Sequence, residues 1–172
     1  MSLPSDIRTE RTLCFLISDD YVLLAKKKSG TFGSDKYNGF GGKKKYDETI
    51  LQCAVRETWE ENSIIIEESD LEQRAIIDFY FPAKPEDNQR VYVYFVYSWI
   101  GNPKGSSEMD AAEQFPLNNL PYDKMWRSDA IWLKELIAGI DIQKKLYGIF
   151  YWNNDNRTVE HYELKDSDLK NV

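Results

Sequence analysis

Residues 42–64 read GKKKYDETILQCAVRETWEENSI, and their spacing is the most informative feature of the chain. The stretch spaces one glycine, one arginine and four glutamates along the chain: Gly42, Glu48, Arg56, Glu57, Glu60 and Glu61. At about 100° per residue, the last three glutamates share one side of a helix. The stretch therefore predicts a helix that concentrates carboxylates directly after a glycine-rich loop.

These carboxylates repel one another unless a cation lies among them. Like charges three or four residues apart destabilise an isolated helix by about 0.2–0.5 kcal/mol per pair. Arg56 is close enough along the chain to reach Glu60, and a hard divalent cation with oxygen ligands would offset much more of the repulsion. The alternative is a solvated acidic helix face. The glycine-rich approach and the additional Glu48 favour the metal site.

The spacing resembles the signature of the Nudix family. Seven positions match that signature: Gly42, Glu48, Arg56, Glu57, Glu60, Glu61 and Ile64. Two positions differ, because Thr58 occupies an aliphatic position and Ser63 replaces the second glycine. We expect Thr58 to turn its methyl group toward the core, together with Leu51, Ala54 and Val55 on the same arc of the helix. We expect the neighbouring Asn62 to adopt the left-handed conformation that ends the helix.

The resemblance extends beyond the signature, from about Thr12 to Leu164, to the Nudix enzymes that hydrolyse oxidised purine nucleoside triphosphates. It is carried by YNGFGGK at 37–43, ETI at 48–50, YDKMW at 122–126, Asp129, Trp132 and KKLYGIF at 144–150. The implied fold is of the α/β class, the Nudix α/β/α sandwich with a mixed β-sheet between helices. We expect a single Nudix hydrolase domain over residues 1–172, with a polar lead-in at 1–10.

The pattern of apolar and turn-forming residues predicts strands over 12–17, 21–25, 75–81, 90–100, 113–117, 145–152 and 158–164. Residues 28–45 are predicted to form a glycine-rich loop region. Asp47 is predicted to cap the start of the first helix, and Ser128 the start of a second helix through Ala138.

The chemistry of pyrophosphate cleavage explains why acidic residues are needed. A phosphate chain repels an approaching water, and divalent cations neutralise that charge and activate the water. The resemblance implies Mg²⁺, with Mn²⁺ as an alternative, held by five residues: Gly41 through its carbonyl, Glu57, Glu60, Glu61 and Glu108. Glu113 is the alternative to Glu108. By the same resemblance Glu61 acts as the base and Arg56 orients the helix glutamates, so Glu61, Glu57 and Arg56 form the expected catalytic set.

The resemblance also implies a purine site. Its expected residues are Thr12, Lys27, Phe32, Asn38, Phe79, Trp126 and Asp129. The alternative for the three aromatic residues is an ordinary role in the core. The subgroup carries two adjacent acids where this chain has Ser128-Asp129. Two adjacent acids can share a proton, so the pair can both donate and accept hydrogen bonds. A single ionised aspartate can only accept them. We therefore predict a narrower base range that favours 8-oxo-guanine over 2-oxo-adenine.

Composition limits the partners. The formal net charge of −7 argues against a nucleic-acid polymer and leaves a small nucleotide as the expected substrate. Two cysteines, Cys14 and Cys53, cannot build a disulfide framework and are expected to be reduced. The chain has neither an 18-residue apolar run nor the apolar core of a signal peptide. We expect a cytoplasmic monomer or homodimer without a membrane partner.

These observations together predict a Mg²⁺-dependent hydrolase that converts an oxidised purine nucleoside triphosphate such as 8-oxo-dGTP to the monophosphate and pyrophosphate. Its purpose would be sanitation of the nucleotide pool. The alternatives are a Nudix hydrolase of ADP-ribose or of an ordinary dNTP, a non-catalytic nucleotide-binding module on the same fold, and a structural domain with an acidic helix.

Overall fold

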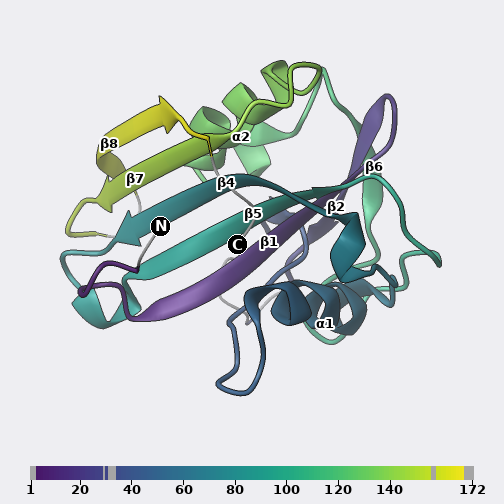
Figure 1. Ribbon diagram of the computed structural model, residues 1–172, viewed down its shortest axis with the longest axis horizontal. Helices are drawn as coiled ribbons and strands as arrows, with labels where there is room; N and C mark the ends of the chain where they lie inside the picture. The colour runs from purple at the N-terminus through teal and green to yellow at the C-terminus, as the bar shows by residue number, and fades with distance from the viewer. Residues whose placement is uncertain (1–2, 29, 31–33, 156–157, 169–172) are drawn as a thin grey trace.

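Strand β1, Thr9–Ile17, directs alternate side chains into two separate cores. Phe15 and Ile17 enter the core beneath helix α2, Asp129–Ala138. Cys14 and Leu16 enter the core beneath helix α1, Ile50–Asn62. Because successive side chains of a strand point to opposite faces, one buried strand can serve two cores. The computed structural model describes residues 3–28, 30, 34–155 and 158–168, with the sheet between the two helices (Figure 1).

The sheet is mixed, in the order β3-β2-β1-β5-β4-β7-β8, with β6 also paired to β2. The other strands are β2 (Tyr21–Lys26), β3 (Tyr37–Asn38), β4 (Leu71–Tyr80), β5 (Gln89–Val96), β6 (Glu113–Pro116), β7 (Leu146–Trp152) and β8 (Val159–Asp166). The β1–β5 and β4–β7 pairs are parallel, and the remaining pairs are antiparallel. Short 3-10 helices cover Glu68–Asp70, Pro85–Asp87 and Tyr122–Lys124. The predicted α/β/α sandwich with a mixed sheet is confirmed.

Helix α1 begins at a different cap from the predicted one. The N-cap is Thr49 rather than Asp47: the Thr49 hydroxyl accepts from the Gln52 N–H at 3.1 Å, and the Gln52 side chain accepts from the Thr49 N–H at 2.9 Å. This reciprocal pair satisfies two amide groups at once, which a cap at Asp47 would not do. Glu48 then lies outside the helix, where its side chain is available to other partners.

Helix α1 also ends differently from the prediction. Ser63, and not Asn62, adopts the left-handed conformation, with φ 57° and ψ 30°, and its N–H donates to the Trp59 carbonyl at 2.8 Å. Asn62 is fully buried, and its side chain bonds a neighbouring loop. Thr58 is buried as predicted, and its hydroxyl donates to the Ala54 carbonyl within the helix at 2.9 Å.

Several strand limits differ from the prediction. β1 begins at Thr9, inside the expected polar lead-in, because the Thr9 N–H donates to the Asn88 carbonyl and Thr9 pairs with Gln89. β4 begins at Leu71 and β5 ends at Val96, since these two residues are register partners at one end of the pair. The short strand β3 lies within the region predicted to be loop.

The second helix begins where it was predicted, although Ser128 does not cap it with its side chain. The Ser128 backbone is already helical, at φ −63° and ψ −33°. Its hydroxyl instead donates to Asp129 at 3.4 Å. Cys14 and Cys53 are buried free thiols, as expected. Among the described residues, no helix is long and apolar enough to cross a membrane.

Candidate functional site

Arg56 lies at the centre of the acidic helix face. Its Nε and Nη2 donate to the two oxygens of Glu48 at 2.9 and 2.7 Å. Its Nη1 donates to Glu57 and to Glu60, both at 2.8 Å. These hydrogen bonds lower the pKa of Glu48 to about 2 and raise the pKa of Arg56 further above its usual range. One guanidinium therefore holds three carboxylates in fixed positions, which its planar fork of donors suits.

Glu61 faces the other way from Arg56 and is 4% exposed. One carboxylate oxygen accepts from Lys27 Nζ at 2.9 Å, and the other accepts from the Gly41 N–H at 2.9 Å. Burial raises the pKa of Glu61, and Lys27 and the Gly41 amide oppose that rise. A carboxylate with a raised pKa binds a proton more readily, as a general base must.

Glycine is required where the loop passes between β1 and α1. A Cβ atom at Gly42 would lie 2.4 Å from the Glu57 carboxylate, and one at Gly41 would lie 1.9 Å from the Thr12 carbonyl oxygen. A side chain at Gly41 would collide with the β1 backbone, and one at Gly42 would displace the Glu57 carboxylate from its position. The two glycines therefore bring the loop backbone into direct contact with the acidic helix.

The direction of the Gly41 carbonyl follows from its neighbours. The carbonyls of Phe40 and Gly42 accept from the N–H groups of Cys14 and Thr12 on β1, at 2.7 and 3.0 Å. The Gly41 N–H points the opposite way, toward Glu61. In extended backbone the N–H and C=O of one residue point to the same side. From this alternation we infer that the Gly41 carbonyl faces α1, on the side where the glutamates lie.

The donor set fits a hard divalent cation. The carboxylates of Glu57, Glu60 and Glu61 and the Gly41 carbonyl could supply the oxygen ligands that such a cation prefers. An ionised carboxylate has about four lone-pair positions, so the bonds from Arg56 and Lys27 leave acceptor capacity. Within the described residues, no group of three or more His, Cys, Asp and Glu side chains is already gathered around one point. A cation at this site would compete with Arg56 and Lys27 for the same oxygens.

The two candidate distal glutamates differ in their surroundings. The Glu108 carbonyl accepts from the Lys28 N–H at 2.8 Å, so Glu108 lies next to the strand extension that carries Lys27. The Glu113 carboxylate accepts from the Tyr37 hydroxyl at 2.8 Å on β3. This hydrogen bond raises the pKa of Tyr37. Glu108 lies beside the segment whose Lys27 reaches Glu61, whereas Glu113 bonds β3, so this placement favours Glu108 as the distal ligand.

A second group of predicted residues gathers beneath α2. Asp129 is 3% exposed and accepts from the Trp126 N–H at 3.2 Å. Burial raises the pKa of Asp129 to about 7, although the Trp126 amide opposes the rise. Phe79 packs in the same core, 5.7 Å from Phe150 between ring centroids. The Trp126 ring makes an edge contact with Trp152 at 6.2 Å. A carboxyl group among aromatic rings can bind the edge of a flat polar ring.

The chain between β2 and β3 connects the acidic group, which is Glu57, Glu60 and Glu61, with the aromatic group, which is Phe79, Trp126 and Asp129. The Lys27 N–H donates to the Lys36 carbonyl at 2.9 Å, which closes a hairpin. The Lys27 side chain reaches Glu61 in the acidic group. The Lys36 side chain donates to the Met125 carbonyl at 3.2 Å and lies 5.3 Å from the Trp126 ring centroid. Sequence reasoning missed Lys36, because a lysine in a polar loop gives no signal that distinguishes it from solvated surface.

The remaining predicted base-site residues lie as follows. Lys27 lies at Glu61, and the Thr12 hydroxyl lies 3.6 Å from Cys53 Sγ on the α1 side. Asn38 pairs with Ala25, and its side-chain oxygen accepts from the Gly39 N–H at 3.0 Å. Phe32 falls outside the described residues.

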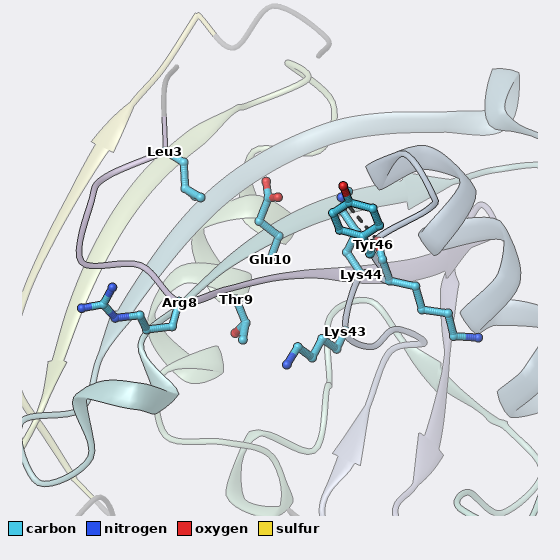
Figure 2. Close-up of a pocket in the computed structure, with 8 residues that line it drawn as sticks. Leu3, Arg8, Thr9, Glu10, Lys43, Lys44 and Tyr46 are labelled. Carbon is cyan, nitrogen blue, oxygen red and sulfur yellow. Dashed lines mark hydrogen bonds between the residues drawn. The ribbon is translucent and has the colours of Figure 1, made fainter.

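A separate cavity of about 330 Å³ opens beside the start of β1. It is lined by Leu3, Arg8, Thr9, Glu10, Lys43, Lys44, Lys45 and Tyr46. In Figure 2 the end of Glu10 points upward, whereas the ends of Arg8 and Lys43 point to the left. A ligand site needs polar groups that converge on one point, and this cavity lacks such an arrangement.

Comparisons with known proteins find related sequences and structures. The model of the NUDIX domain matches residues 8–136. The oxidized purine nucleoside triphosphate hydrolase of Danio rerio is 33% identical over 150 residues, which are 87% of this chain and 90% of the relative. The protein of the same name from Mus musculus is 33% identical over 157 residues, 91% of this chain and 94% of the relative.

Among solved structures, the mutator MutT protein of Bacillus halodurans superposes with a TM-score of 0.76 at 23% identity. The match covers 91% of this chain and 97% of that protein. At this identity the likeness concerns the fold, which agrees with the sandwich in Figure 1.

Proposed function

The chain belongs to the Nudix family of hydrolases, and from this premise we propose that its substrate is an oxidised purine nucleoside triphosphate. The products are the monophosphate and pyrophosphate, formed as one water adds across the bond between the α- and β-phosphates. The observation that carries the proposal is the hairpin that joins the acidic group at Glu61 to the aromatic group at Trp126. The two relatives named above for oxidised purine nucleotides support the choice of base.

We assign the acidic group to the phosphates. Glu57, Glu60, Glu61, the Gly41 carbonyl and Glu108 would hold Mg²⁺, or Mn²⁺ in its place. When bound, the cation supplies charge neutralisation at the phosphates and Lewis-acid activation of water. Glu61 accepts the proton of the attacking water, and its buried position beside Lys27 keeps the carboxylate oriented. Arg56 holds Glu57 and Glu60 in place and does not touch substrate.

We assign the aromatic group to the base. Trp126 and Phe79 provide flat apolar surfaces, Asp129 binds the polar edge of the purine, and Asn38 contributes an amide that both donates and accepts. Lys36, held over the Trp126 ring, fixes the position of that ring. This division of roles gives an enzyme that removes oxidised nucleotides from the nucleotide pool.

A substrate panel tests the proposal. Purified protein with Mg²⁺ is given 8-oxo-dGTP, 2-oxo-dATP, dGTP and ADP-ribose, and the released monophosphate and pyrophosphate are measured. We expect the highest kcat/KM with 8-oxo-dGTP, and no turnover after EDTA treatment. Faster cleavage of ADP-ribose or dGTP would assign a different Nudix substrate, and no cleavage of any compound would indicate a nucleotide-binding module.

The titration of Asp129 makes base preference dependent on pH. Below pH 7 the carboxyl is mostly protonated and can donate as well as accept, and above pH 7 it is ionised and only accepts. We therefore expect the ratio of kcat/KM for 8-oxo-dGTP over 2-oxo-dATP to rise between pH 6 and pH 8. In Asp129→Asn the ratio should not change with pH, because the amide does not titrate. Equal turnover of both nucleotides throughout this range would contradict the assignment.

A further inference from the structure

Asn62 bonds the loop at residues 104–112 to the end of α1. Its side chain is fully buried, and both the nitrogen and the oxygen of the amide form hydrogen bonds. The Nδ2 group donates to the Asp110 carbonyl at 3.2 Å, and Oδ1 accepts from the Ala112 N–H at 2.9 Å. The Asn62 backbone carbonyl accepts from the Lys104 N–H at 3.1 Å. One residue thus bonds three points of this loop.

The same loop is held from its other side by the extension of β2. The Lys28 N–H donates to the Glu108 carbonyl at 2.8 Å, and the Asp110 N–H donates to the Lys26 carbonyl at 2.9 Å. Met109, between them, is fully buried and bridges to Lys27. Glu108 therefore stands between two anchors, and the side chain of Lys27 in the same extension reaches Glu61.

The position of Asn62 in the chain links this anchor to the acidic group. Asn62 follows Glu61 directly, and its Nδ2 also donates to the Glu61 carbonyl at 2.8 Å. The Asn62 amide therefore joins the loop that carries Glu108 to the backbone of Glu61. The Nudix signature allows any residue at position 62, so the signature does not predict these contacts of Asn62.

We propose that Asn62 is a positioning residue for the divalent cation, because its buried amide fixes the loop that presents Glu108 to the glutamates of α1. The proposal rests on the proposed function, in which Glu108 is the distal ligand. Residues that hold a metal ligand in place typically change metal affinity 10- to 100-fold when they are replaced. We expect Asn62→Ala to weaken Mn²⁺ binding about tenfold.

A double-mutant cycle tests whether Asn62 acts through Glu108. The dissociation constant of Mn²⁺ is measured without substrate, from the paramagnetic resonance signal of free Mn²⁺, for wild type, Asn62→Ala, Glu108→Gln and the double variant. We expect the double variant to bind Mn²⁺ as weakly as Glu108→Gln alone, because the loop then has no ligand to position. Glu113→Gln is the control: it should bind like wild type and should still respond to Asn62→Ala.

Circular dichroism melts establish that each variant is folded, and Asn62→Ser replaces Asn62→Ala if the alanine variant does not fold. Equal weakening by the Asn62 substitution with and without Glu108 would overturn the proposal, as would unchanged Mn²⁺ affinity. The predicted coupling without pyrophosphate release from 8-oxo-dGTP would support the role of Asn62 and refute only the proposed substrate.

Discussion

Replacing Glu61→Gln is expected to lower kcat about 10²–10⁴-fold, the usual contribution of a positioned general base. The glutamine has nearly the same size and can still accept the hydrogen bond from the Gly41 N–H, so the fold should persist. It cannot take a proton from water, and it offers the cation a neutral oxygen in place of a charged one. The measurement is pyrophosphate release at saturating substrate and Mg²⁺, beside a thermal melt.

The matched control for this substitution is Glu68→Gln. Glu68 is an exposed acid on the 3-10 helix that follows α1, and the same chemical change there should leave kcat unaltered. An unchanged kcat in Glu61→Gln would refute the assigned base. A loss of kcat accompanied by unfolding at the assay temperature would show that Glu61 is needed for the fold, contrary to the expectation.

The second large effect is expected for Arg56→Ala. Removing the guanidinium leaves Glu48, Glu57 and Glu60 facing one another without the positive charge of Arg56 between them. The side chain of Arg56 is 19% exposed, so solvent screens part of the repulsion. We expect the free energy of unfolding to fall by about 2 kcal/mol, measured by urea titration. We also expect kcat/KM to fall about 10- to 100-fold, because the glutamates lose their orientation.

Two further variants separate charge from geometry at this position. Arg56→Lys keeps the positive charge but not the planar fork, so it should recover part of the stability and little of the activity. Arg8→Ala removes an exposed arginine that lines the unassigned cavity, and both measurements should equal those of wild type. If Arg56→Ala retained full kcat/KM, Arg56 would not be orienting the glutamates.

The sequence was most informative where spacing alone sets geometry. The intervals between the glutamates predicted the helix and its acidic face, because the helical period leaves few alternatives. The prediction of the sandwich depended on a family resemblance, since periodicity does not define how strands are ordered in a sheet. The limits of β4 and β5 were wrong because register partners, and not local propensity, decide where a strand ends.

The contacts that the sequence did not reveal are long-range and polar. Asn62 was interpreted as a helix-ending residue, yet its amide bonds a loop about 50 positions further along the chain. Lys36 meets Trp126 across 90 positions. The cap at Thr49 was missed because Asp47 and Thr49 are both good capping residues, and only the reciprocal bond with Gln52 distinguishes them. Such choices depend on tertiary partners that no local pattern shows.

A crystal structure with Mg²⁺ and a non-hydrolysable analogue of 8-oxo-dGTP would show whether the glutamates of α1 bind a divalent cation. We predict Mg²⁺ bound to oxygens of Glu57, Glu60 and Glu61, with at least one of these carboxylates moved away from Arg56 or Lys27. Carboxylates still bonded to Arg56 and Lys27, with no ion between them and the phosphates, would contradict the account.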